Sequence, residues 1–167
     1  YGDGDETTVV GYGNDEDNKH TTTYFRHMFM VAETENFQSL TVRLKRDDGA
    51  VVYLNGNEII RDNMPTGPIY YDTFATDAVS SDEEDVFFSW FLSNDLLQDG
   101  ENSIAVEIHQ VSESSSDISF DLELIGTSYS NIVLMDSISF TNQISDVSYG
   151  RMNNELGWSY FGEPTPG

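Results

Sequence analysis

The chain has 167 residues, of which 30 are Asp or Glu and 7 are Lys or Arg, so its formal net charge is −23 at pH 7. Nucleic acids and anionic membranes are bound through Lys and Arg, and this charge therefore argues against both as partners. There is no Cys, which excludes disulfides and thiol chemistry, and no apolar run is long enough to span a bilayer.

Alternating apolar and polar residues predict a series of short strands with turns between them. Leu40, Val42 and Leu44, for example, alternate with polar residues, which is typical of a half-buried strand. The Asn55-Gly56 pair predicts a tight hairpin, because both positions accept a positive φ. The predicted strands cover residues 21–31, 40–45, 50–54, 58–60, 86–92, 104–109, 118–124, 132–140 and 146–149. Short strands with turns between them predict an all-β antiparallel sandwich.

Four segments resemble, in order, a galactose-binding-like jelly roll of large secreted bacterial proteins: residues 24–31, 46–56, 99–110 and 115–124. The resemblance covers residues 1–126 and implies an antiparallel jelly-roll sandwich located outside the cell or at the cell surface. It also implies a structural calcium ion near the N-terminal loop.

Residues 127–167 are predicted to form an appended C-terminal β segment and linker. Within it, residues 146–151, Trp158 and residues 164–167 resemble the closing strands of a lamin-tail-like sandwich.

The start of the chain differs from the resembled jelly rolls, which begin about one strand earlier. The chain opens in a Gly/Asp-rich loop without an initiator Met, so we expect it to be a piece of a longer protein. A sandwich that lacks a strand has an open edge, and we expect residues 132–140 to pair with such an edge. Pairing within the chain gives a monomer, whereas pairing with a neighbour gives a head-to-tail fibre, the form that the sequence favours. The apolar residues of this assembly strand are Ile132, Leu134, Ile138 and Phe140.

Acidic residues cluster in three places that predict calcium sites, because Ca²⁺ takes six to eight oxygen ligands from carboxylates, amides and carbonyls. The alternative is a solvated surface that keeps the protein soluble. The candidate ligands are Asp3, Asp5 and Glu6, then Asn14, Asp15 and Asp17, and finally Asp82 and Asp85.

The inventory of catalytic groups argues against an enzyme. His20, His27 and His109 lie in separate segments without the spacing of zinc ligands. The sequence has neither a nucleophile elbow nor a glycine-rich phosphate loop. Paired carboxylates are abundant, so counting alone does not exclude a glycosidase.

His109 shares a strand face with Glu107, opposite the apolar face of that strand. We expect it to form a polar cross-strand pair near Asp121, Glu123 or Arg43 rather than to bind a ligand.

Tyr70, Tyr71 and Phe74 lie in a long loop and are the candidate platform for a glycan, because aromatic faces cover the apolar side of a sugar ring. The competing expectation, which we favour from the sequence, is that these rings pack under the loop, pinned by Pro65 and Pro68.

Together these features predict a non-catalytic, calcium-stabilised extracellular β-sandwich module for adhesion or assembly at a bacterial surface, through glycan binding or tethering. Two alternatives remain: a fibre subunit assembled by strand complementation between like subunits, and an accessory domain of a secreted hydrolase.

Overall fold

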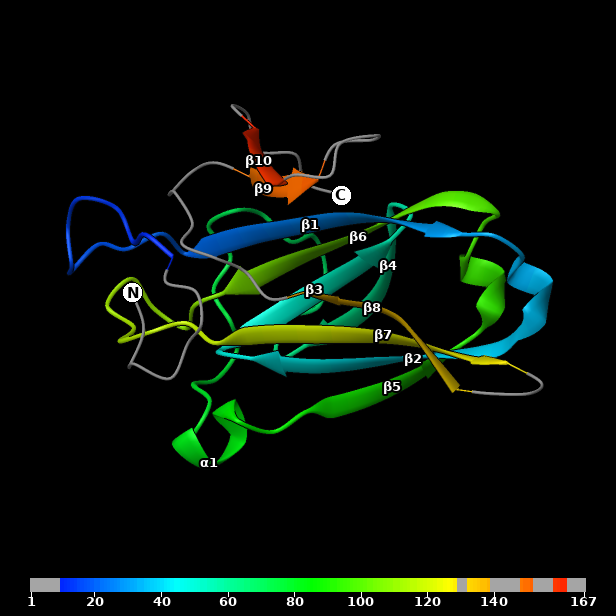
Figure 1. The fold of residues 1–167 in the computed structure, drawn as a ribbon. Coiled ribbons are helices and arrows are strands. Elements are labelled where there is room, and N and C mark those ends of the chain that lie inside the picture. Colours follow the sequence, from blue (N-terminus) through cyan, green and yellow to red (C-terminus); the bar gives the residue numbers. More distant parts are fainter. Residues whose placement is uncertain (1–9, 129–131, 139–147, 152–157, 162–167) are drawn as a thin grey trace.

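Two antiparallel four-stranded sheets face each other in a β-sandwich, as the strand pattern predicts (Figure 1). The computed structural model describes residues 10–128 and, by their backbone alone, residues 132–138, 148–151 and 158–161. The all-β fold class is therefore confirmed.

The first sheet has the order β1-β6-β3-β4. Its strands are β1 (Thr22–Val31), β6 (Gly100–His109), β3 (Gly49–Leu54) and β4 (Asn57–Asp62).

The second sheet has the order β5-β2-β7-β8. Its strands are β5 (Phe88–Leu92), β2 (Phe37–Arg46), β7 (Phe120–Ser128) and β8 (Ile132–Ile138). A separate two-stranded sheet, β9 (Ser148–Arg151) and β10 (Trp158–Phe161), lies beside β1 (Figure 1).

Helices are short in the described part of the chain. The helix α1 (Ser81–Glu84) precedes β5, and 3-10 turns cover Thr34–Asn36 and Asn94–Leu96.

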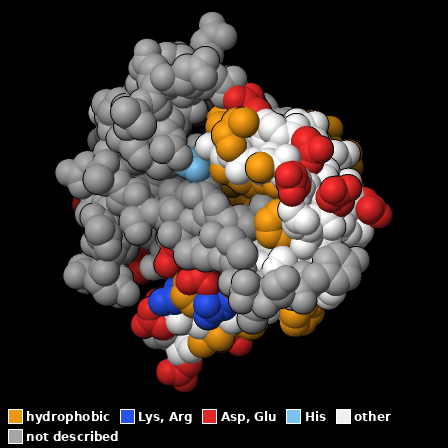
Figure 2. Space-filling model, turned by 45° about the vertical axis from the view of Figure 1, so that its right-hand side comes forward, with side chains coloured by type: hydrophobic (Ala, Val, Ile, Leu, Met, Phe, Trp, Pro, Cys, Tyr) orange, Lys and Arg blue, Asp and Glu red, His pale blue; other side chains and the backbone are white. Residues whose placement is uncertain are grey.

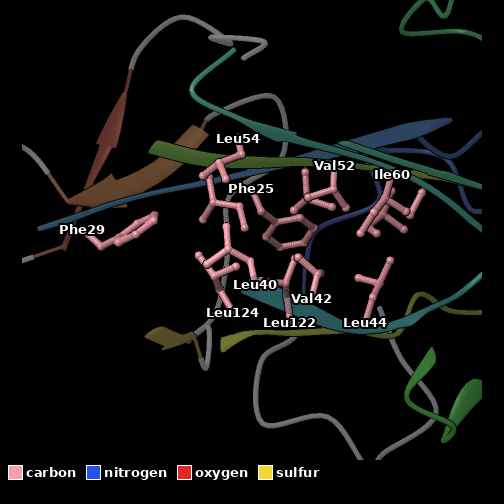
Figure 3. Close-up of a cluster of buried hydrophobic side chains, with 14 of the residues drawn as sticks. Phe25, Phe29, Leu40, Val42, Leu44, Val52, Leu54, Ile60, Leu122 and Leu124 are labelled. Carbon is pink, nitrogen blue, oxygen red and sulfur yellow. The ribbon is translucent and has the colours of Figure 1, made fainter. Parts of the chain in front are cut away.

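The core lies between the two sheets, where the inward side chains of each sheet meet (Figure 3). Leu40, Val42 and Leu44 of β2 are fully buried and face Val52 and Leu54 of β3. Burying one such side chain contributes about 1.5–3 kcal/mol to the free energy of folding. Because alternate side chains of a strand point to the same face, each strand buries its apolar residues in the sandwich.

The Asn55-Gly56 hairpin joins β3 to β4 as predicted, with φ angles of 52° and 77°. The Asn55 amide also ties this turn to β6. Its Nδ2 donates to Asn102 Oδ1 over 2.8 Å, and its Oδ1 accepts from the Ser103 N–H over 2.9 Å.

The strand β8 pairs antiparallel with β7 of the same chain, for example at Ile125 and Leu134. The sequence favours pairing of this segment with a neighbouring chain, whereas here it lies at the edge of its own sandwich. Only three residues separate the two strands, a length that suits a hairpin between adjacent antiparallel strands. Phe140 lies outside the described residues.

Candidate functional site

The long connection between β4 and α1 forms an ordered loop against the first sheet. We call residues 63–80 the aromatic loop. Its close approach to the sheet is possible because residue 49 is a glycine. A Cβ atom there would lie 2.5 Å from Met64 Sδ and 2.9 Å from Ala75 Cβ.

Three polar contacts fasten the middle of the aromatic loop to the end of the sheet. The Thr22 hydroxyl donates to the Tyr71 carbonyl over 2.6 Å, and His109 Nδ1 lies 2.7 Å from the Thr73 carbonyl oxygen. The Ala75 N–H donates to the Gln110 carbonyl over 2.9 Å. The backbone of the loop is thus held at alternate residues, in the manner of an extra strand.

Two further side chains brace the ends of the loop. Asn63 Nδ2 donates to the Asp77 carbonyl over 2.6 Å, and Asn63 Oδ1 accepts from the Asp77 N–H over 3.1 Å. Arg61 Nη1 donates to the carbonyls of Pro65 and Gly67 over 2.9 and 2.7 Å. These contacts order the loop through its backbone.

The three aromatic side chains of the loop are exposed: Tyr70 is 63% exposed, Tyr71 73% and Phe74 38%. The expectation that these rings pack under the loop is therefore wrong. The reason is physical: polar contacts to the backbone and the buried Ala75 hold the loop, so the rings are not needed for its packing.

Polar side chains on the outer face of the first sheet lie near the loop. Tyr24 of β1 is paired in register with Glu107 of β6. Burial and then the negative charge of Glu107 raise the pKa of Tyr24 to about 12, and Asp72 of the loop adds to the shift. Burial and Glu107 likewise raise the pKa of Tyr53, on β3, to about 12.

His109 does not pair with the residues expected from the sequence. It is fully buried, and its Nε2 lies 3.3 Å from Glu107 Oε2 on its own strand. Arg43 and Glu123 form a salt bridge in the other sheet. The expectation failed because the strand β6 belongs to the first sheet, whereas β2 and β7 belong to the second.

The sequence did not predict that Tyr24, Tyr53 and Glu107 lie close together on the outer face of the first sheet. Each lies on the outward side of its strand's two-residue alternation, which was a usable signal. What the alternation could not show is that β1, β6 and β3 are adjacent, because that depends on the topology.

The predicted calcium ligands are not brought together in the described part of the chain. Asn14, Asp15 and Asp17 are exposed, and Asp15 Oδ1 accepts from the Asp17 N–H over 3.0 Å. Asp82 is exposed, and Asp85 pairs with Lys45 over 3.1 Å. Within residues 10–128, no three His, Asp or Glu side chains converge as metal ligands would. Asp3, Asp5 and Glu6 lie outside the described residues, and calcium binding remains a prediction.

The surface carries the charge that the composition indicates. Acidic side chains are spread over the face shown in Figure 2, and Lys and Arg side chains gather in one small area with acids beside them. In the described part, no helix has both the length and the apolar character needed to cross a membrane.

No protein-family model and no curated protein sequence matches the chain. Among solved structures, an α-L-rhamnosidase of Streptomyces avermitilis complexed with L-rhamnose is 16% identical, over 72% of this chain and 11% of that chain, with a TM-score of 0.46. The α-L-rhamnosidase of Dictyoglumus thermophilum is 13% identical, over 71% of this chain and 13% of that chain, with a TM-score of 0.45. A family GH78 rhamnosidase of Bacillus sp. GL1 is 17% identical, over 77% of this chain and 12% of that chain, with a TM-score of 0.44. This chain thus spans a small part of those enzymes, and similarity at this level assigns it neither a family nor an activity.

Proposed function

We propose that this chain is a non-catalytic carbohydrate-binding module of the galactose-binding-like type, working outside the cell, with the aromatic loop as its binding site. One observation carries the proposal: Tyr70, Tyr71 and Phe74 are exposed on a loop whose backbone is fastened to the sheet. Large aromatic side chains in solvent contribute little to stability, and a fastened loop holds them ready for a ligand.

The chemistry of the loop suits a sugar. The faces of Tyr70 and Tyr71 can cover the apolar C–H side of a pyranose, while the exposed carboxylate of Asp72, the next residue, accepts hydrogen bonds from hydroxyls. Because the loop is already ordered, binding costs little conformational entropy.

The charge around the loop favours a neutral sugar over an acidic one. Asp72 and Glu107 act together on Tyr24, so their negative potential reaches the same region of the surface. The whole chain is strongly acidic as well. A uronic or sialic acid would meet repulsion there, whereas a neutral hexose or deoxyhexose would not.

A glycan array that carries neutral and acidic sugars tests the proposal. The unmodified chain should be retained on a subset of the neutral glycans, and the double variant Tyr70→Ala/Tyr71→Ala should lose that retention. Phe91→Ala is the matched control, because Phe91 is 82% exposed but lies on β5 in the other sheet. This control variant should bind like the unmodified chain.

The unfolding midpoint in urea should stay close to that of the unmodified chain in both variants, because none of the three rings is buried. Retention of the double variant at full strength, or an equal loss in Phe91→Ala, would refute the assignment of the site.

A further inference from the structure

A pair of adjacent carboxyl groups lies beneath the aromatic loop, at the turn between β2 and β3. Asp47 is 3% exposed and Asp48 is 2% exposed. Adjacent buried acids are costly unless each carboxyl group has a partner or a proton.

Asp48 has partners, and they belong to two different segments. Its Oδ1 accepts from the Val79 N–H over 2.8 Å, and its Oδ2 accepts from the Val111 N–H over 2.7 Å. Its carbonyl oxygen accepts from Asn63 Nδ2 over 3.0 Å. One residue therefore fastens both ends of the aromatic loop and the segment that follows β6.

Among the described residues, the Asp47 carboxyl group has no backbone donor of this kind. The side chains that act on its carboxyl group, within the described residues, are all acidic: Asp48, Asp117 and Glu84. The neighbouring cation, Arg46, is directed elsewhere, since its Nε donates to Asp62 over 2.7 Å. Burial, then a hydrogen bond to Asp48, raise the pKa of Asp47 to about 8.

We propose that a proton held between Asp47 and Asp48 controls the fastening of the aromatic loop. While Asp47 is protonated, it donates to Asp48, and Asp48 keeps its two backbone donors. Once the proton leaves, two adjacent carboxylates repel each other in a buried place, and Asp117 and Glu84 add to the repulsion. The contacts from Val79 and Val111 to Asp48 then weaken, and the loop opens at that end.

The direction in pH follows from the raised pKa. The loop is fully fastened at pH values below the ordinary pKa of an aspartate. Its contacts to Asp48 are lost as pH rises through the raised pKa of Asp47, about 8. This inference concerns the loop itself and does not depend on sugar binding. If the aromatic loop does bind a glycan, retention should weaken over the same pH range.

Nuclear magnetic resonance of the isotope-labelled full chain tests the inference without any ligand. The ¹³C shift of the Asp47 carboxyl group is followed from pH 4 to 9.5 at fixed ionic strength, together with amide hydrogen exchange corrected for its intrinsic pH dependence.

We expect the Asp47 carboxyl to titrate near pH 8. The protection of the Val79, Ala75 and Thr76 amides should fall by up to about tenfold per pH unit as pH rises toward that step, and should level off above it. The protection of Val106, in the centre of the first sheet, should stay constant. Titration of Asp47 below pH 5, or loop protection that is constant through its titration, would overturn the inference.

Asp47→Asn supplies the variant test, because the amide keeps the shape of the acid and cannot lose a proton. Its loop amides should remain protected at pH 9.5. Asp99→Asn is the control: Asp99 also accepts from a backbone N–H, that of Thr34 over 2.8 Å, but it lies in an exposed contact. This control should show the unmodified pH profile. If Asp47→Asn folds and its loop protection falls with pH as much as that of the unmodified chain, the inference is refuted. If the variant does not fold, the titration of the unmodified chain decides alone.

Discussion

His109 and Glu107 lie two residues apart on β6, and their side chains meet, with Nε2 3.3 Å from Oε2. The other ring nitrogen, Nδ1, lies 2.7 Å from the Thr73 carbonyl and 2.9 Å from the Thr22 hydroxyl. The Thr22 hydroxyl donates its own proton to the Tyr71 carbonyl oxygen. Both ring nitrogens thus lie within hydrogen-bonding distance of oxygen atoms on other residues. The fully buried ring joins the sheet to the aromatic loop.

Replacing His109 by Leu should lower the free energy of unfolding by about 3 kcal/mol, because it removes the His109 partner of the buried Glu107 carboxylate and of the Thr73 carbonyl. Urea unfolding at pH 6 measures the loss. Thr22→Val, which removes one hydroxyl with its contacts to Tyr71 and His109 but leaves the ring in place, should cost only about 1 kcal/mol. The double variant His109→Leu/Glu107→Leu should be less destabilised than His109→Leu alone, since it removes the unpaired charge as well. Equal stability of His109→Leu and the unmodified chain would contradict this account of the contact.

Gly49→Ala should displace the aromatic loop. The added Cβ would overlap Met64 Sδ and the Cβ of Ala75, at 2.5 and 2.9 Å, and overpacking of this kind costs about 1–3 kcal/mol. Loop amides should lose protection against hydrogen exchange more than the amides of β2 do. The control is Gly56→Asn: this glycine has φ of 77°, nothing would crowd a Cβ there, and Asn tolerates that conformation. A Gly49→Ala variant with unchanged stability would mean that the loop is not packed against this residue.

The fold was predictable because burial in a sandwich follows directly from alternation along each strand. Leu40, Val42 and Leu44 alternate in the sequence and are fully buried in the structure. The Asn55-Gly56 turn was predictable as well, since its chemistry is local. The helix α1 was not foreseen, because four residues are too few to show a helical period.

The site was harder to predict because its contacts are distant in the sequence. His109 reaches a carbonyl 36 residues away, and Asp48 reaches an amide 31 residues away. Nothing in the loop sequence shows that such contacts exist. The sequence therefore favoured packing of the aromatic rings as the interaction that orders the loop. For the same reason the Asp47-Asp48-Gly49 sequence, which is typical of a turn, does not show that the segments that fold over it bury both carboxyl groups.

The raised pKa values of Tyr24 and Tyr53 predict a late step in alkaline titration. Both values rise to about 12, from an ordinary value of about 10, so the unfolded chain releases these protons first as pH increases. The free energy of unfolding should therefore fall between about pH 10 and pH 12. Absorbance at 295 nm after a rapid pH jump should show a component near pH 12. That component should be absent from Tyr24→Phe/Tyr53→Phe and from the unmodified chain in urea. Its persistence in the double variant would assign it to other tyrosines.

Calcium should raise the melting temperature if the acidic loops bind it. The net charge of −23 supplies the attraction, and binding to the folded state alone adds about 2.7 kcal/mol at 100 times Kd. The titration is run at constant ionic strength with Mg²⁺ as a control, because general screening would act with either cation. Asp15→Asn/Asp17→Asn should weaken the response if the loop at residues 14–17 is involved. A melting temperature that does not change with Ca²⁺ would leave these acids as a solvated surface.

The pairing of β8 with β7 predicts how the chain unfolds and whether it assembles. Leu134 pairs with Ile125 in register, and a proline at position 134 removes an N–H and distorts the strand. If the pairing is within the chain, Leu134→Pro should lower the free energy of unfolding by about 1–3 kcal/mol, because it removes a backbone donor from the strand. The unfolding midpoint of the unmodified chain should then be independent of protein concentration. If β8 instead completes the sandwich of a neighbour, the midpoint should rise with concentration, and size-exclusion chromatography with negative-stain imaging should show fibres that Leu134→Pro abolishes. We expect the first outcome, because a three-residue connection makes the chain's own edge the nearest partner of this strand at any concentration.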